Sequence, residues 1–350
     1  MIKFKIKNRT IDKYQKPFIV AELSANHGNS LSIALKSISE AKKNGADAIK
    51  IQTYTADSMT LNSRQKIFKI KKGLWKGKYL YDLYKKASTP YKWHKKIFDY
   101  CKKNNIICFS TPFDENAVDL LENLNCPVYK IASFEITDLP LIQYVINKRK
   151  PIIVSTGMAS ITEINDVINL FKLNNFKNYM LLHCVSSYPA PTKDIRLQNI
   201  EYLKSKYNCE VGLSDHTLGN EIASFSVIKG APLIEKHFIL KRNIKSPDNA
   251  FSMLPKELNN LRKLADLAWQ INKDINFNLK KSEKENLIFR RSLFFSADLK
   301  KGTKLGKKHI IRRRPGFGLP PKFEQKIIGK ILNKNVKFAQ LIKKKYLVSK

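Results

Sequence analysis

The chain has 350 residues, of which 43% are hydrophobic and 27% are charged. This is enough apolar material for one large domain and a small second one, and it excludes a mainly disordered protein. Lys and Arg number 65 against 29 Asp and Glu, a formal net charge of +36. The lysines are spread in pairs without a zinc-finger, RNP or basic-zipper pattern. The sequence therefore argues against specific nucleic-acid binding and predicts a positive field that favours an anionic substrate.

The N-terminal segment and the cysteines favour a cytoplasmic protein. Residues 1–7 (MIKFKIK) alternate apolar and charged side chains, unlike a secretory signal, and predict a small strand at the floor of the following domain. No apolar stretch approaches the ~20 residues that span a bilayer, so no membrane partner is expected. Five scattered cysteines without a C-x-x-C pair predict a reducing compartment, with Cys108 and Cys184 as small buried thiols.

Short apolar runs dominate the first 240 residues, and each ends in a polar or charged cluster. Such runs are typical of parallel strands that are covered on both faces. Stretches with helical spacing separate them, for example 31–43 and 161–173, and a last helix is predicted over 255–271. Repeated strand–helix units of this kind predict an α/β fold, a (β/α)₈ TIM barrel. The eight predicted strands are 18–22, 48–52, 106–110, 128–133, 151–155, 179–183, 210–214 and 233–237.

Three other segments complete the predicted organisation. The barrel is expected to occupy residues 1–275, and its connection 56–90 is long enough to be a lid or binding loop. The aromatic residues of this connection are equally consistent with a small subdomain packed over the barrel mouth. A polar linker is predicted over 276–290, followed by a small β-rich domain over 291–350 that docks on another surface.

Polar side chains follow the predicted strands where those strands end. Active sites of TIM barrels lie at the C-terminal strand ends, so this pattern predicts an enzyme. The residues expected at the barrel mouth are Glu22, Lys50, Gln52, Lys130, Ser133, Glu135, Ser155, His183, Asp215, His216 and His237.

Two histidines are candidate metal ligands. His216 and His237 follow neighbouring strands, so their imidazoles can converge on one divalent ion such as Mn²⁺, with water and substrate oxygens as the other ligands. Two satisfied buried histidines are the alternative. Asp248 follows the last strand and is a candidate for a metal ion or a sugar hydroxyl, or else forms an Asx turn.

Two lysines, Lys50 and Lys130, end strands that point to the same mouth. One interpretation is Schiff-base chemistry, and the other is an anion clamp. Serines such as Ser133 and Ser155 favour the clamp, because hydroxyl and ammonium groups together suit phosphate or carboxylate oxygens. Glu22 and Glu135 add carboxylates that can transfer protons.

Several motifs together resemble the sialic acid synthase family over nearly the whole chain. They are AELSANH at 21–27, KIQTY at 50–54, YKIASFE at 129–135, STGM at 155–158, GLSDHT at 212–217, EKHF at 235–238 and RPG at 314–316. Within the family, LSANH, QTY, PDNAFS at 247–252 and the Trp75 loop followed by LYDLY at 80–84 resemble the branch that forms pseudaminic acid. The resemblance implies condensation of phosphoenolpyruvate (PEP) with 2,4-diacetamido-2,4,6-trideoxy-L-altrose, with phosphate released by C–O cleavage.

The resemblance also implies roles for individual residues. Glu22 would accept a proton from the attacking water, and Glu135 would contact the substrates. A divalent ion, with Mn²⁺ favoured over Mg²⁺ or Co²⁺, would be held by His216 and His237. PEP would be bound by Lys50, Gln52, Lys130, Ser133, Ser155 and Ser214, and the sugar by Tyr188, Asp248 and Arg314.

The tail resembles the antifreeze-like (SAF) domain of these synthases. The resemblance implies a homodimer in which this domain reaches the partner's barrel mouth and presents Arg314; a surface arginine in a basic run is the alternative. One departure is Ser186, where the N-acetylneuraminate branch carries Asn, so sugar contacts of that loop are not transferred. N-acetylneuraminate synthase, legionaminate synthase and a lysine-dependent aldolase remain as alternatives.

Overall fold

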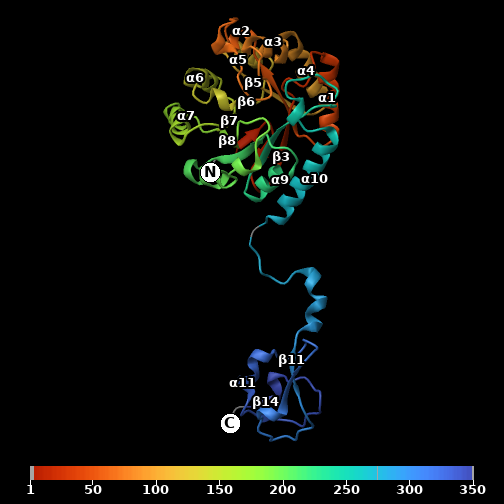
Figure 1. The fold of residues 1–350 in the computed structure, drawn as a ribbon. Helices are drawn as coiled ribbons and strands as arrows, with labels where there is room; N and C mark the ends of the chain where they lie inside the picture. Colours follow the sequence, from red (N-terminus) through yellow and green to blue (C-terminus); the bar gives the residue numbers. More distant parts are fainter. Residues whose placement is uncertain (1–3, 274, 349–350) are drawn as a thin grey trace. The chain divides into compact units, whose positions relative to one another are not determined.

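The computed structural model describes residues 4–273 and 275–348. The chain divides into two compact units, residues 1–273 and 274–350 (Figure 1).

The first unit is a closed barrel of eight parallel strands in sequence order, with the last strand pairing with the first. The predicted TIM barrel is therefore confirmed. Its strands are β3 (Phe18–Glu22), β4 (Ala48–Thr53), β5 (Ile107–Pro112), β6 (Tyr129–Ile131), β7 (Ile152–Ser155), β8 (Tyr179–Cys184), β9 (Glu210–Asp215) and β10 (Leu233–His237).

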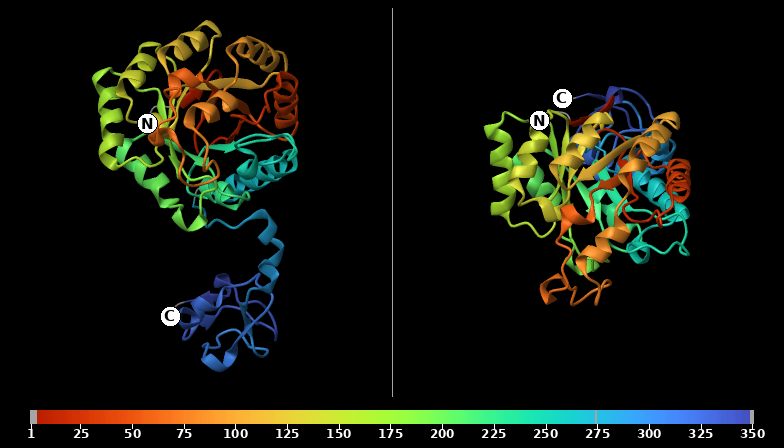
Figure 2. Two further views of the ribbon diagram at one scale, coloured as in Figure 1. Left: turned by 45° about the horizontal axis from the view of Figure 1, so that its top comes forward. Right: turned by 90° about the horizontal axis from the view of Figure 1, so that it is seen from above.

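Helices form the outer layer around the strands (Figure 2). The predicted helices 31–43, 161–173 and 255–271 are present with these bounds. Local signals start two of them: the Ser30 side chain caps one, and Ser160 and Glu163 form a capping box on another. The layer consists of α1 (Leu31–Lys43), α4 (Tyr91–Lys103), α5 (Glu115–Asn123), α6 (Leu139–Asn147), α7 (Ile161–Leu173), α8 (Gln198–Tyr207), α9 (Glu221–Ile228) and α10 (Pro255–Ile271).

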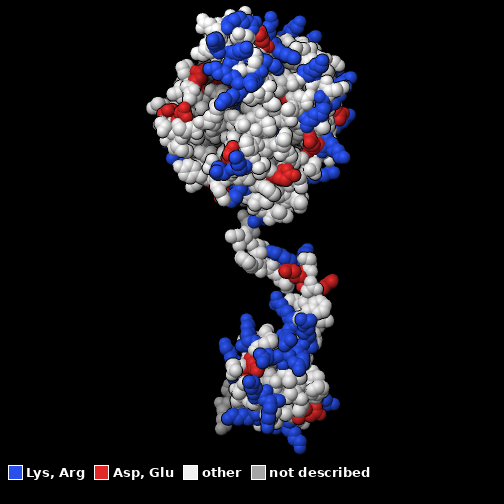
Figure 3. Space-filling model, viewed as in Figure 1, with Lys and Arg blue, Asp and Glu red and all other residues white. Residues whose placement is uncertain are grey.

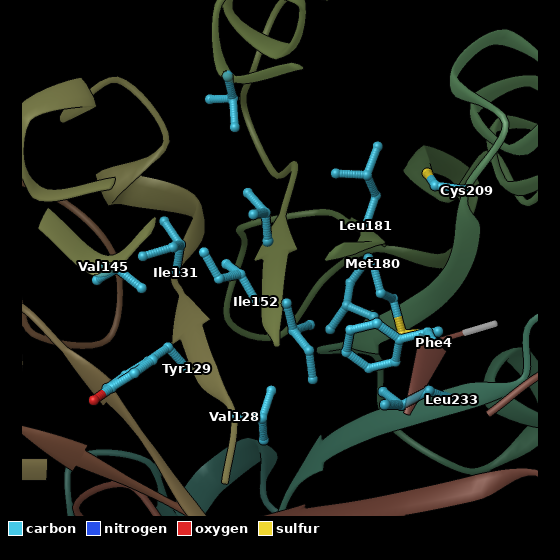
Figure 4. Packing of buried hydrophobic residues seen from close by; sticks show 14 of the residues in the cluster. Phe4, Val128, Tyr129, Ile131, Val145, Ile152, Met180, Leu181, Cys209 and Leu233 are labelled. Atoms are coloured by element: carbon cyan, nitrogen blue, oxygen red, sulfur yellow. The ribbon is translucent and has the colours of Figure 1, made fainter. Parts of the chain in front are cut away.

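A short hairpin covers the floor of the barrel, the end where the strands begin. It consists of β1 (Phe4–Ile6) and β2 (Arg9–Ile11), paired antiparallel. Phe4 belongs to one buried apolar cluster with Met180 and Leu233, which lie at the starts of their strands (Figure 4). The predicted N-terminal strand is thus present from Phe4 onward, while residues 1–3 lie outside the described part of the chain.

The long connection 56–90 has secondary structure of its own. It contains α2 (Ala56–Met59), the 3-10 helix η1 (Lys66–Phe68) and α3 (Leu80–Ala87), drawn in orange in Figure 1. Its Trp75 indole Nε1 donates to the Pro247 carbonyl over 3.1 Å, so the connection is attached to the loop that follows β10.

The second unit is small and rich in short strands. It has two antiparallel strand pairs and an apolar core of its own, and Lys and Arg form large patches on the face seen in Figure 3. The predicted linker 276–290 contains two 3-10 helices, η5 (Lys281–Glu283) and η6 (Glu285–Phe289). The other elements are β11 (Ser292–Phe295), η7 (Lys307–His309), β12 (Ile310–Arg313), η8 (Pro321–Phe323), α11 (Glu324–Ile327), β13 (Ile331–Leu332), η9 (Lys344–Tyr346) and β14 (Leu347–Val348).

Two further predictions can be compared with the structure. All five cysteines are free and buried, which confirms the buried thiols predicted at Cys108 and Cys184. Within residues 4–273 and 275–348, no helix is long and apolar enough to cross a membrane.

Candidate active site

Four charged side chains meet inside the barrel at the C-terminal ends of the strands. Strand register explains why, since Glu22 of β3 lies beside Lys50 of β4 on one side and beside His237 of β10 on the other. Lys50 Nζ lies 3.1 Å from Glu22 Oε2 and 3.2 Å from Glu235 Oε1, and Lys130 Nζ lies 3.8 Å from Glu235 Oε1. All four residues are buried. We call Glu22, Lys50, Lys130 and Glu235 the charged network.

Burial and mutual attraction shift the pKa values within the charged network. Burial raises the pKa of Glu22 to about 7, although Lys50 opposes this shift. Burial lowers the pKa of Lys130 to about 8, against the attraction of Glu235. For Lys50 and Glu235 burial opposes the charged form, but the attraction of their partners outweighs it; the pKa of Lys50 is raised and that of Glu235 is lowered. The network therefore holds groups that change charge near neutral pH.

Hydroxyl groups surround the two lysines. Lys130 Nζ donates to Ser155 Oγ over 2.7 Å, and Lys50 Nζ donates to Thr111 Oγ1 over 3.2 Å. Ser214 Oγ donates to Glu235 Oε1 over 3.3 Å. Ammonium and hydroxyl donors in one buried place are suited to the oxygens of phosphate or carboxylate.

Ser133 follows β6, the strand that carries Lys130, and its surroundings require a glycine. The Gly157 N–H donates to Ser133 Oγ over 3.1 Å. A Cβ on Gly157 would lie 2.7 Å from Ser133 Oγ and 2.2 Å from Ser186 Oγ, so no other residue allows this close approach. Within the STGM motif, Ser155 thus ends β7, and the Gly157 N–H holds Ser133 by a hydrogen bond.

The two predicted metal ligands face each other at the mouth. The ring centroids of His216 and His237 are 5.5 Å apart. His216 Nδ1 lies 3.0 Å from the Val185 carbonyl oxygen, so the tautomer that donates there leaves Nε2 with a lone pair. His237 Nδ1 is buried without a hydrogen-bond partner, 3.7 Å from Asp248 Oδ2. Burial and the neighbouring His216 lower the pKa of His237 well below its usual value.

This pair suits a divalent ion that takes its remaining ligands from water and substrate. Neutral imidazole nitrogens with free lone pairs are good ligands for such ions. Among residues 4–273 and 275–348, no three or more His, Cys, Asp or Glu side chains are grouped as a metal site.

The thiol of Cys184, which the sequence predicted only as a buried group, lies beside His216. Cys184 Sγ is 3.7 Å from His216 Nδ1. Burial raises the pKa of Cys184, but attraction to His216 outweighs this and brings it to about 7. The pKa of His216 is raised, because Cys184 outweighs the effect of burial. Because Cys184 directly follows the predicted strand 179–183, the sequence could have placed it at the barrel mouth.

A cavity of about 450 Å³ opens above the charged network. Several predicted site residues line it, namely Gln52, Glu135, Tyr188, His237 and Asp248. Burial raises the pKa of Glu135 to about 7 and that of Asp248 above its usual value. The Tyr188 ring centroid lies 4.3 Å from that of His216. The structure therefore brings Glu135, the predicted sugar contacts Tyr188 and Asp248, and one predicted metal ligand, His237, to one cavity.

Two residues expected at the mouth face away from it. Asp215 pairs with Lys236 Nζ and lies one residue beyond Ser214, which points inward to Glu235. Alternate strand residues occupy opposite faces, so Asp215 and Lys236 lie on the helix side of the sheet. His183 precedes the inward Cys184 and is excluded from the mouth for the same reason. Arg314 lies in the second unit, with its guanidinium 5.9 Å from the centre of the Phe289 ring.

Glu235 belongs to the charged network but is not among the site residues predicted from the sequence. This glutamate contacts both lysines and accepts from Ser214, so it holds the charged network together. A signal was available, because Glu235 precedes His237 by two residues on one strand and therefore shares its face.

The closed barrel and the charged network at its C-terminal strand ends define a TIM-barrel enzyme. The chain belongs to the NeuB family, whose model matches residues 37–276.

Named relatives agree with this assignment. The chain is 44% identical to a pseudaminic acid synthase of Campylobacter jejuni, covering 97% of this chain and 98% of that protein. It is 36% identical to an N,N'-diacetyllegionaminic acid synthase of the same species, covering 94% and 99%. A solved N-acetylneuraminic acid synthetase from Leptospira borgpetersenii in complex with citrate has a TM-score of 0.73 at 33% identity, covering 81% of this chain and 95% of that one.

Proposed function

We propose that this enzyme condenses PEP with 2,4-diacetamido-2,4,6-trideoxy-L-altrose to give pseudaminic acid and phosphate. The relative named pseudaminic acid synthase is more similar to this chain than the relative named legionaminic acid synthase, which supports this product. The charged network is the observation that carries the proposal, because a buried site with two lysines and several hydroxyls is built for a small, strongly anionic substrate.

The lysines and hydroxyls would hold PEP. Lys130 and Ser155, whose polar atoms lie 2.7 Å apart, would bind phosphate oxygens together with Ser133. Lys50, Gln52 and Ser214 would bind the remaining oxygens of phosphate and carboxylate. Glu235 would hold the ammonium groups of Lys50 and Lys130 in position until PEP binds. Glu135 would contact the substrates from the wall of the cavity.

The reaction forms one C–C bond and one C–O bond and breaks one C–O bond. C3 of PEP attacks the aldehyde carbon of the open-chain sugar, water adds to C2, and the bond from C2 to the phosphate oxygen breaks, which leaves a carbonyl at C2. Of the two protons of that water, one ends on the former aldehyde oxygen and the other leaves with phosphate. Glu22 would take the proton of the attacking water, since its raised pKa of about 7 makes it a base matched to neutral pH. Neighbouring Lys50 would hold the carboxylate of Glu22 in place.

We also propose a divalent ion, with Mn²⁺ favoured over Mg²⁺ or Co²⁺, held by His216 and His237. When bound, such an ion polarises a carbonyl oxygen and so favours attack on the aldehyde. The Val185 carbonyl would fix the ring of His216, and Asp248 would orient His237 or contact the sugar together with Tyr188.

The second unit is proposed to be an antifreeze-like (SAF) domain of a homodimer, in which Arg314 reaches the sugar in the partner's barrel. Light scattering should give a dimer mass, and Arg314→Ala should lower kcat/KM about 10- to 100-fold with the fold intact, as for loss of a charged hydrogen bond. A monomer mass at all concentrations, or unchanged kinetics, would contradict this assembly.

We propose that the enzyme works in the cytoplasm. All five of its cysteines are free and buried, which is in keeping with a reducing compartment.

The decisive experiment is phosphate release from PEP with Mn²⁺, with an EDTA control for each acceptor. The acceptors are the altrose sugar, N-acetylmannosamine and the mannose-configured diacetamido sugar. EDTA-sensitive release with the altrose sugar alone would support the proposal, and release with another acceptor would assign the enzyme to the legionaminate or N-acetylneuraminate branch. No release with any of them would contradict the reaction. Borohydride trapping with pyruvate would reveal the imine that a lysine-dependent aldolase forms.

A further inference from the structure

The cavity above the charged network has two chemically different sides. One side carries the polar residues of the candidate site. The other side is mostly apolar, although Lys72 also lines the cavity, and we call six of its residues the apolar wall: Tyr54, Ile70, Leu80, Leu83, Tyr84 and Phe113. A cavity of about 450 Å³ is within the ordinary range for a small-molecule site.

Most of the apolar wall comes from the connection 56–90, and it is held in place by specific contacts. Trp75 attaches this connection to Pro247 through its indole N–H, and its ring centroid lies 5.9 Å from that of Tyr188. Within the wall, the ring of Tyr54 contacts those of Tyr84 and Phe113 edge to face, with centroids 5.9 and 5.2 Å apart. The wall is therefore a fixed part of the cavity and not a chance exposure of apolar residues.

The orientation of the sugar follows from the reaction. The aldehyde carbon must meet PEP at the charged network, deep in the barrel. The opposite end of the open chain, which carries C6, is then left near the rim. Among the aliphatic side chains that line the cavity, Ile70 and Leu80 keep part of their surface exposed, so we place them at the rim, with Leu83 buried beside them. None of the three offers a hydrogen-bond partner.

We propose that the apolar wall selects an acceptor sugar whose C6 is a methyl group, against a sugar with a hydroxyl on C6. This proposal rests on the proposed function. Contact with Leu80 and Leu83 removes a methyl group from water, which is favourable in free energy. A C6 hydroxyl at the same place would lose its hydrogen bonds to water and form no others. Apolar pockets reject an added hydroxyl by about 10²-fold at most, so a preference of about 10- to 100-fold in kcat/KM is expected.

The test compares two acceptors that differ only at C6: 2,4-diacetamido-2,4,6-trideoxy-L-altrose and the same sugar with a C6 hydroxyl. Phosphate release gives kcat/KM for each with the wild type, Leu80→Asn, Ile70→Asn and the control Leu61→Asn. Leu61 belongs to the same connection but is 69% exposed and lies outside the wall. Leu80 and Ile70 are only half-buried, so both polar variants should fold, which circular dichroism would verify.

The wild type and Leu61→Asn should prefer the 6-deoxy sugar about 10- to 100-fold. In Leu80→Asn and Ile70→Asn this ratio should fall at least about threefold, because the new amide can bond the C6 hydroxyl. Equal kcat/KM values for the two acceptors with the wild type, or an unchanged ratio in both wall variants, would overturn the role of the wall while leaving the proposed function intact. No turnover of either acceptor by the wild type would instead overturn the proposed function, and the inference with it.

Discussion

The two ends of the same eight strands have opposite chemistry. At the floor, Phe4 closes the barrel against Met180 and Leu233, and these side chains are almost completely buried. At the mouth, equally buried positions hold Glu22, Lys130 and their partners, and several polar atoms there have no hydrogen-bond partner. Apolar burial stabilises the fold, whereas buried unpaired polar atoms oppose folding. The comparison indicates that the floor carries the stability and that the mouth is kept for chemistry at a cost to stability.

The strongest test of this division is Glu22→Gln at the mouth. Loss of the proton acceptor should lower kcat about 10²- to 10⁴-fold. The midpoint of thermal unfolding should move by less than about 4 °C, because Lys50 keeps Glu235 as its partner. Steady-state kinetics and calorimetry measure both, with the exposed Glu201→Gln as control. A large loss of stability with full activity would reverse the assignment.

The opposite change is Phe4→Ala at the floor. Removing this ring should lower the free energy of unfolding by about 3–5 kcal/mol through lost burial and a residual cavity. kcat at 25 °C should stay within about twofold, since Phe4 lies at the far end of the strands from the charged network. Phe225→Ala is a matched control, because Phe225 is 54% exposed. Denaturant titration would give the comparison, and a drop in kcat without a change in stability would contradict it.

The pH dependence should come from the mouth alone. Glu22 must be ionised to accept a proton, so kcat/KM should rise with pH through about 7. Lys130 must be protonated to attract an anion, so kcat/KM should fall above about 8. The expected profile is a bell with each limb approaching about tenfold per pH unit. A flat profile between pH 6 and 9 would exclude these two groups as its origin.

The smallest expected effect compares two tryptophans that make the same hydrogen bond at opposite ends. Trp75 Nε1 donates to Pro247 at the mouth and Trp269 Nε1 donates to Lys13 near the start of β3, over 3.1 and 3.2 Å. Trp75→Phe should raise the KM of the sugar about 2- to 12-fold, the equivalent of one hydrogen bond. Trp269→Phe should leave that KM unchanged. Equal effects on KM would mean that Trp75 does not shape the sugar cavity.

Much of the fold could be predicted because its signals are local. Runs such as 18–22 and 210–214 are apolar throughout, and only strands covered on both faces produce that pattern. The motifs also predicted correctly that Lys50, Lys130 and both histidines lie at the C-terminal ends of the barrel strands. The helices within 56–90 were missed, because they are short and depend on contacts such as that of Trp75 with Pro247.

The side of the sheet that each strand-end residue faces was harder to predict. Asp215 and Ser214 are neighbours at the end of one strand, and only pairing with Glu235 and Lys236 shows which one points inward. The same register would have identified Glu235. Where no residue at a strand end has a known direction, the sequence does not show which of two neighbouring residues points into the barrel.

Charge balance in the charged network has a thermodynamic consequence. Its two ammonium groups face two carboxyl groups, so the site is close to neutral before PEP arrives. The phosphate and carboxylate of PEP together bring about −2.5 to −3 charges at pH 7. Glu22, with a pKa of about 7, then lies beside an added anion and should take up a proton as PEP enters. The measured heat of PEP binding should therefore depend on the ionisation enthalpy of the buffer, and the enzyme would draw from solvent a proton that must leave again before Glu22 can act as a base.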